Sequence, residues 1–125
     1  MSELPVPLAD GIVPVPVTVG TLRERGFNQT ILLSRILSKE LRIPVRMNML
    51  YKKRETRPQI GLGAKERVSN LKNAFEVRER ANDLRLILLD DVMTTGATVR
   101  ECSKVLLKAG AREVVVVTLA RSALN

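Results

Sequence analysis

The stretch that decides the fold is RLILLDDVMTTGATVREC, residues 85–102. Its four consecutive apolar residues, Leu86 to Leu89, are typical of a strand that is buried on both faces. Asp90 and Asp91 follow where this strand is expected to end, and a turn at Gly96 leads into a helical pattern. Because ligands of open α/β sheets bind beyond the carboxyl ends of the strands, the two aspartates are placed to meet a ligand.

The residues after the aspartates suit an anionic ligand. The first amides and the positive dipole end of the following helix favour a phosphate, and Thr94, Thr95 and Thr98 add hydroxyl donors. With Asp90 and Asp91 as acceptors for sugar hydroxyls, the segment predicts a site for a phosphorylated sugar. The two carboxylates can also hold Mg²⁺, directly or through water, next to a diphosphate. A simpler interpretation, in which Thr98 caps the helix and the aspartates are a solvated strand end, explains only one of the threonines.

The first half of the chain alternates between strand and helix patterns. Residues 11–17, GIVPVPV, predict a short strand that becomes a loop, because its prolines lack amide donors. A helix is expected from Asn28 and ends before Pro44. Alternation then predicts a half-buried strand at Val45, Met47 and Met49. The apolar stripe of the helix consists of Leu32, Leu33, Ile36, Leu37 and Leu41.

The second half continues the alternation. A polar, basic loop with Pro58 precedes a short helix over Ala64 to Leu71, and the strands AFEV and LRLILLD flank an RERAND turn. A helical stripe follows and stops at Gly110, before the continuous apolar strand VVVVTL. This order predicts one α/β domain over residues 1–125, with a mainly parallel sheet covered by helices on both faces. The stripe consists of Val99, Cys102, Val105, Leu106 and Ala109.

Composition restricts the chemistry. The chain has no histidine and a single cysteine, Cys102, so an internal disulfide, a cage of several thiolates and histidine-based nucleophilic catalysis are excluded. Cys102 is expected to be a buried packing residue. The 21 Lys and Arg against 13 Asp and Glu give a net charge of +8, which attracts anions of any kind. With neither a membrane-spanning run nor a signal peptide at the start given, a cytoplasmic protein is expected.

The stretch LILLDDVMTTGAT resembles the fingerprint of type I phosphoribosyltransferases, the loop that binds phosphoribosyl pyrophosphate (PRPP). The resemblance implies that Asp90 and Asp91 are the catalytic pair, which holds the ribose hydroxyls and Mg²⁺, and that the phosphate lies at the following loop. The PRPP-binding residues that it implies are Asp90, Asp91, Val92, Met93, Thr94, Thr95, Gly96, Ala97 and Thr98. A P-loop is excluded because no Gly-Lys-Ser/Thr ending occurs.

Further stretches resemble the competence protein F family, a branch of these phosphoribosyltransferase-like proteins associated with DNA uptake. They are DGIVPVPVTVGTLRERGFNQT, RPQIGLGAKERVSNLKNAFEV and VTLARS. The resemblance implies a pyrophosphate-binding turn at Pro16, Val17 and Thr18. It also implies anion or partner contacts in the family motif, although Arg23 and Arg25 also fit an ordinary solvated turn. The motif residues are Arg23, Arg25, Gly26, Phe27, Asn28 and Gln29.

The basic segment from Lys52 to Arg67 resembles the flexible hood that closes over PRPP in such enzymes. Closure would exclude water and neutralise the departing pyrophosphate. A mobile surface loop without this role is the alternative. The basic residues of the segment are Lys52, Lys53, Arg54, Arg57, Lys65 and Arg67.

The resemblance implies Mg²⁺-dependent transfer of the phosphoribosyl group from PRPP to a nitrogen acceptor, with release of pyrophosphate. Two departures matter. Thr94 replaces an aspartate that serves as a base in hypoxanthine-type relatives, which disfavours purine salvage. The cysteine-rich zinc segment of competence protein F relatives is also missing, so the chain is either a short form or a fragment without its N-terminal portion.

Three classes of function therefore remain. They are an active transferase, a PRPP or nucleotide sensor without turnover, and a basic adaptor for single-stranded DNA or competence proteins. Acceptor and oligomeric state stay open.

Overall fold

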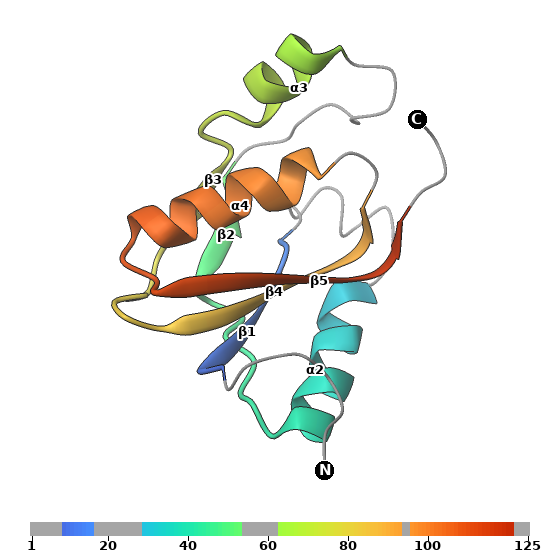
Figure 1. Ribbon diagram of the computed structural model, residues 1–125, viewed down its shortest axis with the longest axis vertical. Helices are drawn as coiled ribbons and strands as arrows, with labels where there is room; N and C mark the ends of the chain where they lie inside the picture. Colours follow the sequence, from blue (N-terminus) through green and yellow to red (C-terminus); the bar gives the residue numbers. More distant parts are fainter. Residues whose placement is uncertain (1–8, 17–28, 54–62, 94–95, 122–125) are drawn as a thin grey trace.

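The computed structural model describes residues 9–16, 29–53, 63–93 and 96–121. Three strands of the described chain form a parallel sheet in the order β1-β4-β5 (Figure 1). This arrangement confirms the predicted α/β class with a mainly parallel sheet. The elements are β1 (Gly11–Pro14), α2 (Gln29–Leu41), β2 (Leu50–Lys52), α3 (Ala64–Leu71), β3 (Phe75–Val77), β4 (Arg85–Met93), α4 (Ala97–Lys108) and β5 (Glu113–Arg121).

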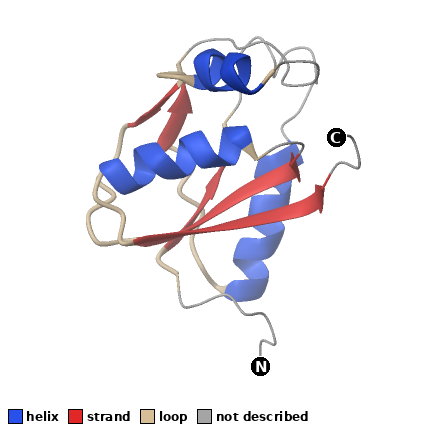
Figure 2. Cartoon of the chain, turned by 45° about the horizontal axis from the view of Figure 1, so that its top comes forward, coloured by secondary structure: helices blue, strands red, loops and turns tan. Residues whose placement is uncertain are grey.

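Helix α4 lies on one face of the parallel sheet and α2 on the other (Figure 2), and a buried apolar cluster lies on each side. Because successive residues of a strand point to opposite faces, β4 supplies both layers. Leu86 and Leu88 join the cluster that contains Cys102 and Leu106 of α4, whereas Ile87 joins the cluster packed by α2. The continuous apolar run of β4 is thus explained by burial on both sides.

A second, two-stranded antiparallel sheet lies on the α4 side. It consists of β2 and β3, with Lys52 opposite Phe75 and Leu50 opposite Val77. Leu50 and Phe75 belong to the same buried cluster as Cys102 of α4. The small sheet therefore packs against α4, and its core is continuous with that of the parallel sheet.

The prediction of a strand at residues 45–49 is wrong. Val45 forms only an isolated parallel bridge with Ile12, and a turn follows at Met47 and Asn48. Met49 is fully buried, whereas Met47 is 40% exposed, so the alternation of these residues reflects a bend rather than a strand.

The position of α2 confirms the helix expected between Asn28 and Pro44. Its apolar stripe, however, is only partly buried. Leu33 and Leu37 pack against the sheet, whereas Leu32 and Ile36 are 54% and 56% exposed. The buried side of the helix instead includes Ser34, whose hydroxyl donates to the Thr30 carbonyl oxygen at 2.8 Å. Because this hydroxyl is hydrogen-bonded within the helix, Ser34 is tolerated against the sheet. The apolar stripe of α2 therefore extends from the sheet onto the exposed side of the helix.

None of the helices in the described ranges has the length and apolar character needed to cross a membrane.

Candidate functional site

The candidate site lies at the carboxyl edge of the parallel sheet, where β1 stops and β4 continues. The Val15 amide donates to the Leu89 carbonyl oxygen at 2.9 Å, which is the last bond described between these two segments. Pro14 and Pro16 cannot donate, so the ladder ends here. Beyond Leu89, β4 pairs with β5 as far as Met93. The strand is therefore longer than the predicted LRLILLD, which ended at Asp90, since β4 continues through Asp91 to Met93.

Asp90 is half-buried and lies opposite Thr118 in the β4–β5 register. Residues directly opposite each other in a sheet share a face. Thr118 adds a hydroxyl next to Asp90 at the edge where β1 has ended. Sequence reasoning assigned it no role, although it is the one polar residue of VVVVTL and interrupts that apolar run.

The turn between β4 and α4 confirms the expected special role of Gly96. Gly96 is the N-cap of α4 with φ 81 and ψ 0, a left-handed conformation that glycine adopts without strain. Its carbonyl oxygen accepts from the Arg100 amide at 2.9 Å. Among the described residues no side chain caps the helix, and Thr98 is the second helical residue, so the simpler interpretation of Thr98 as the cap is wrong. The N-terminal end of α4 is thus built from backbone, as phosphate sites at helix termini are.

Several predicted site residues lie outside the described chain. In the PRPP loop these are Thr94 and Thr95, and at the pyrophosphate turn Val17 and Thr18; Pro16 is described and directly follows Val15. The rest are Arg23, Arg25, Gly26, Phe27 and Asn28 of the family motif, and Arg54 and Arg57 of the basic segment. Gln29 is described and begins α2 as an exposed residue.

The predicted hood is shorter at both ends than the segment from Lys52 to Arg67. Lys52 is the last residue of β2, and the Lys53 amide donates to the Ala74 carbonyl oxygen at 2.8 Å. At the other end, Lys65 and Arg67 belong to α3, where Lys65 is exposed. The pairing of β2 with β3 therefore fixes the backbone of Lys52 and Lys53.

The pKa of the Cys102 thiol in α4 depends on its burial and on charged groups near it. Its side chain is fully buried, which confirms the expected packing role. Burial raises the pKa of the Cys102 thiol, the negative charges of Asp90 and Glu101 raise it further, and the positive charge of Lys52 lowers it. Asp90 and Lys52 thus act on the same buried thiol from the end of β4 and the end of β2.

Asp90 is the described carboxylate that could hold Mg²⁺ beside a phosphate ligand. In the described part of the chain, no three acidic or cysteine side chains come together as a metal cluster. Mg²⁺ is commonly bound by one or two carboxylates, water and substrate phosphates. Asp90, half-buried in β4 a short turn before the N-terminal end of α4, suits that mode of binding.

Solved structures with similar folds include an enzyme of purine biosynthesis and a purine phosphoribosyltransferase. An allosteric regulatory enzyme of purine biosynthesis matches 93% of this chain and 23% of its own, with a TM-score of 0.62 and 24% identity. A purine phosphoribosyltransferase from Pyrococcus horikoshii matches 90% of this chain and 61% of its own, with a TM-score of 0.56 and 21% identity. The chain therefore has the type I phosphoribosyltransferase fold.

Curated relatives are more similar in sequence. Competence protein F of Haemophilus influenzae is 44% identical over 118 residues, covering 92% of this chain and 52% of that protein. DNA utilization protein YhgH of Escherichia coli K12 is 39% identical over 115 residues, covering 92% and 51%. Competence protein ComFC of Bacillus subtilis is 34% identical over 113 residues, covering 89% and 44%.

These relatives confirm the resemblance to competence protein F seen in the sequence motifs. The chain is homologous to competence protein F, ComFC and YhgH over most of its length. It spans about half the length of the curated relatives that it matches. No family model matches it.

Proposed function

We propose that this protein binds PRPP at the carboxyl edge of β4 and transfers its phosphoribosyl group to a nitrogen acceptor. The observation that carries this proposal is the geometry of the β4–α4 turn. Asp90 and Asp91 precede a helix whose N-cap is Gly96 in a left-handed conformation, and no described side chain caps this helix. Sugar acceptors and a backbone phosphate cradle are thereby separated by a single short turn.

In this proposal the protein contributes positioning and charge. Asp90 and Asp91 accept hydrogen bonds from the ribose hydroxyls, and the first amides of α4 receive the 5-phosphate together with the hydroxyls of Thr94, Thr95 and Thr98. The pyrophosphate would lie at the turn that begins at Pro16, directly after the end of β1. Mg²⁺ would neutralise charge on the diphosphate as it leaves. Holding the reactants in line lowers the entropic part of the barrier to such a displacement.

The acceptor is proposed to be a nitrogen nucleophile that needs no aspartate base from the loop. Thr94 stands where hypoxanthine-type relatives have that aspartate, and a threonine hydroxyl does not accept a proton at neutral pH. A sensor that binds PRPP without turnover is the alternative for the same site. The two differ in whether bound PRPP is consumed in the presence of amine and base acceptors.

Calorimetric titration with PRPP, with and without Mg²⁺, tests the proposal. The parent is compared with a variant carrying Asp90→Asn and Asp91→Asn. Asp83→Asn is the matched control, because Asp83 is an 81% exposed aspartate with positive φ, a conformation that asparagine also tolerates. Mg²⁺-dependent binding by the parent and the control, but not by the double variant, is expected. A folded parent that does not bind PRPP would overturn the proposal.

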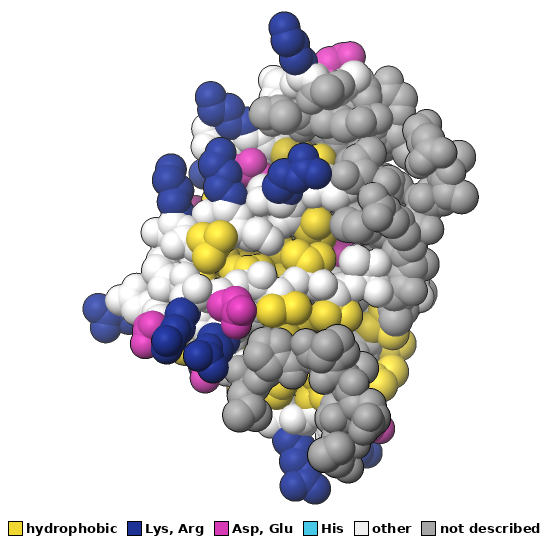
Figure 3. All heavy atoms as spheres, viewed as in Figure 1, with side chains coloured by type: hydrophobic (Ala, Val, Ile, Leu, Met, Phe, Trp, Pro, Cys, Tyr) yellow, Lys and Arg dark blue, Asp and Glu magenta, His cyan; other side chains and the backbone are white. Residues whose placement is uncertain are grey.

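A role in handling DNA is the second candidate, favoured by the names of the relatives. Competence protein F and DNA utilization protein YhgH are homologues, and the upper part of the face in Figure 3 carries several basic side chains. A basic surface binds phosphate backbones with little sequence preference. The exposed basic residues of α3, α4 and the segments next to β3 include Lys65, Lys72, Arg78, Lys104 and Lys108.

Fluorescence anisotropy with a labelled single-stranded oligonucleotide tests this second role. Affinity should fall steeply with salt, and Lys104→Gln with Lys108→Gln should weaken binding. Lys39→Gln, at an exposed lysine of α2 on the opposite layer, is the control. Binding that survives loss of Asp90 and Asp91 would separate this role from the PRPP site, and equal affinities for all the lysine variants would exclude the α4 surface.

A further inference from the structure

Strand β5 is the outermost of the described strands on one side of the parallel sheet. The strand order is β1-β4-β5, and no strand in the described ranges pairs with the outer side of β5. β5 is nine residues long, from Glu113 to Arg121. The seven residues between these charged ends contain neither a charge nor a proline. An edge of this length exposes unpaired amides and carbonyls that can pair with another strand.

The other described sheet edges have features that disfavour pairing with a further strand, namely a proline, a charged residue or short strands. The opposite edge of the parallel sheet is closed by Val45, which makes a single bridge and is flanked by Pro44 and Arg46. In the small sheet, β2 and β3 are three residues each. Prolines, charges and short strands are the usual protection of sheet edges. Among the described strands, β5 alone combines length with an uncharged apolar interior.

Both faces of the β5 edge are incompletely covered. Val116, on the α4 side, is 38% exposed, and Val115 and Val117, on the α2 side, are half-buried. In Figure 3, drawn in the orientation of Figure 1, hydrophobic side chains form a band along the course of β5. Helix α2 packs mainly against β1 and β4, and Leu32 and Ile36 on its outer side remain exposed.

We propose that β5 pairs antiparallel with β5 of a second copy of this chain, about a two-fold axis at Val117. In that register residue 113 lies opposite residue 121 of the other copy. Glu113 therefore faces the position of Arg121 at both ends of the interface, and Val117 faces itself. Opposite charges directly across an antiparallel pair stabilise it, and β-branched pairs pack well there. The parallel sheet would then continue from one copy into the other.

Self-complementarity is the argument for a second copy as the occupant. A two-fold interface uses the same surface on both partners, so a strand with a negative residue at its start and a positive residue at its end matches itself in the antiparallel direction. Two chains of net charge +8 repel each other over long distances. Local pairing of Glu113 with Arg121 at each end opposes this repulsion where the copies meet.

Sedimentation velocity of the full chain over the micromolar concentration range tests the proposal with a charge exchange. Glu113→Arg places like charges opposite each other at both ends and should raise the dimer dissociation constant about tenfold. Arg121→Glu should do the same. The double variant with both changes restores opposite charges and should recover the parent dissociation constant. Circular dichroism melts verify that all variants are folded.

Amide hydrogen exchange supplies a second readout that does not depend on mutation. Protection of β5 amides should rise with protein concentration, whereas the amides of β1 should not respond. A parent that stays monomeric throughout the concentration range overturns the proposal. A dimer whose dissociation constant is equal in the parent, both single variants and the double variant also overturns it, because the interface would then lie elsewhere.

Discussion

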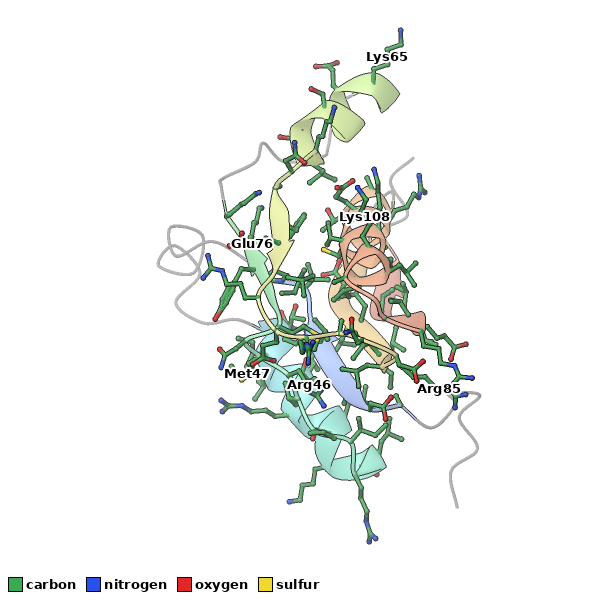
Figure 4. The ribbon with its side chains drawn as sticks, turned by 90° about the vertical axis from the view of Figure 1, so that its left-hand side faces the viewer. Arg46, Met47, Lys65, Glu76, Arg85 and Lys108 are labelled. Carbon is green, nitrogen blue, oxygen red and sulfur yellow. The ribbon has the colours of Figure 1, made fainter. Side chains whose placement is uncertain are left out.

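The side chain of Arg46 lies across Gly11 so closely that a Cβ atom on Gly11 would fall 2.7 Å from the Arg46 Cδ. Figure 4 shows Arg46 beside β1. The backbone contributes to this approach, because the Arg46 amide donates to the Ile12 carbonyl oxygen at 2.8 Å. Gly11 thus occupies a strand position where a side chain has no room, and the arginine stem covers the start of β1.

Gly11→Ala is therefore expected to destabilise the protein by about 1–3 kcal/mol, because the methyl group overpacks a buried site. Arg46→Ala in the same background should recover most of this loss, since it removes the atoms that the methyl group meets. Urea unfolding of the parent, both single variants and the double variant gives the coupling energy. Additive effects of the two substitutions would contradict the contact.

A related prediction concerns the Arg46 guanidinium itself. Within the described structure its Nε atom is buried without a hydrogen-bond partner. Replacing a buried, unsatisfied donor by an apolar group of similar shape removes its desolvation cost, so Arg46→Met should raise the free energy of unfolding by about 1 kcal/mol. Arg42→Met, at an exposed position, is the control. A loss of stability confined to Arg46→Met would indicate that Nε is satisfied in solution.

The outer face of α2 provides a contrast between leucines of one helix. Leu37 packs into the cluster under α2, so Leu37→Ala should cost about 2 kcal/mol. Leu32 is 54% exposed, and Leu32→Ala should change stability by about 0.5 kcal/mol or less. Thermal unfolding at low protein concentration compares the two. Equal losses would mean that Leu32 is buried by an element that covers α2 in solution.

The helix α2 also marks a limit of sequence prediction. Periodicity located the helix within one residue of its start at Gln29, but it grouped Leu32 and Ile36 with the buried leucines. The period gives the apolar side of a helix, whereas the orientation of that side relative to the sheet depends on neighbours distant in sequence. Ser34 is buried instead because its hydroxyl is satisfied locally, which hydrophobicity does not register.

At the candidate site, the sequence correctly predicted the turn at Gly96, which depends on neighbouring residues alone. It did not predict the end of β4, which depends on pairing with another strand. Gly96 was correctly placed in a special turn, because a glycine directly before a helical stripe is typical of a backbone that turns with positive φ. The predicted strand LRLILLD ended too early, at Asp90, because two adjacent aspartates are typical of a strand end. Pairing with β5 carries β4 on to Met93, and it also brings Thr118 opposite Asp90. Neither the extension of β4 nor the position of Thr118 can be predicted from the sequence of one strand alone.

Gly96 itself yields a test that separates stability from ligand binding. Its φ of 81 strains residues with a side chain, so Gly96→Ala should lower the free energy of unfolding by about 1 kcal/mol. Gly96→Asn should lose less, because asparagine tolerates this conformation. In the proposed function both variants also weaken PRPP binding by crowding the cradle. Urea unfolding ranks the two variants by their loss of stability, and calorimetry ranks them by their loss of PRPP affinity. A different ranking in the two measurements would show that ligand binding and stability depend on Gly96 separately.

The buried thiol of Cys102 gives a prediction about pH. Burial, with Asp90 and Glu101 adding to it and Lys52 opposing it, raises the pKa of Cys102 above its ordinary value of 9.0. The native thiol should therefore stay protonated and unreactive towards a thiol reagent at pH values where the unfolded chain reacts readily.

The same shift makes stability depend on alkaline pH. The unfolded chain releases the thiol proton above about pH 9, whereas the folded protein retains it, so this contribution to stability is complete below that pH and is lost as pH rises. The loss should approach about 1.4 kcal/mol for each further pH unit. Cys102→Ala should be less stable than the parent at neutral pH because of the cavity, and the difference should shrink above about pH 9. Urea unfolding across this range measures both proteins, and parallel profiles or rapid labelling of the native thiol would contradict a buried, neutral Cys102.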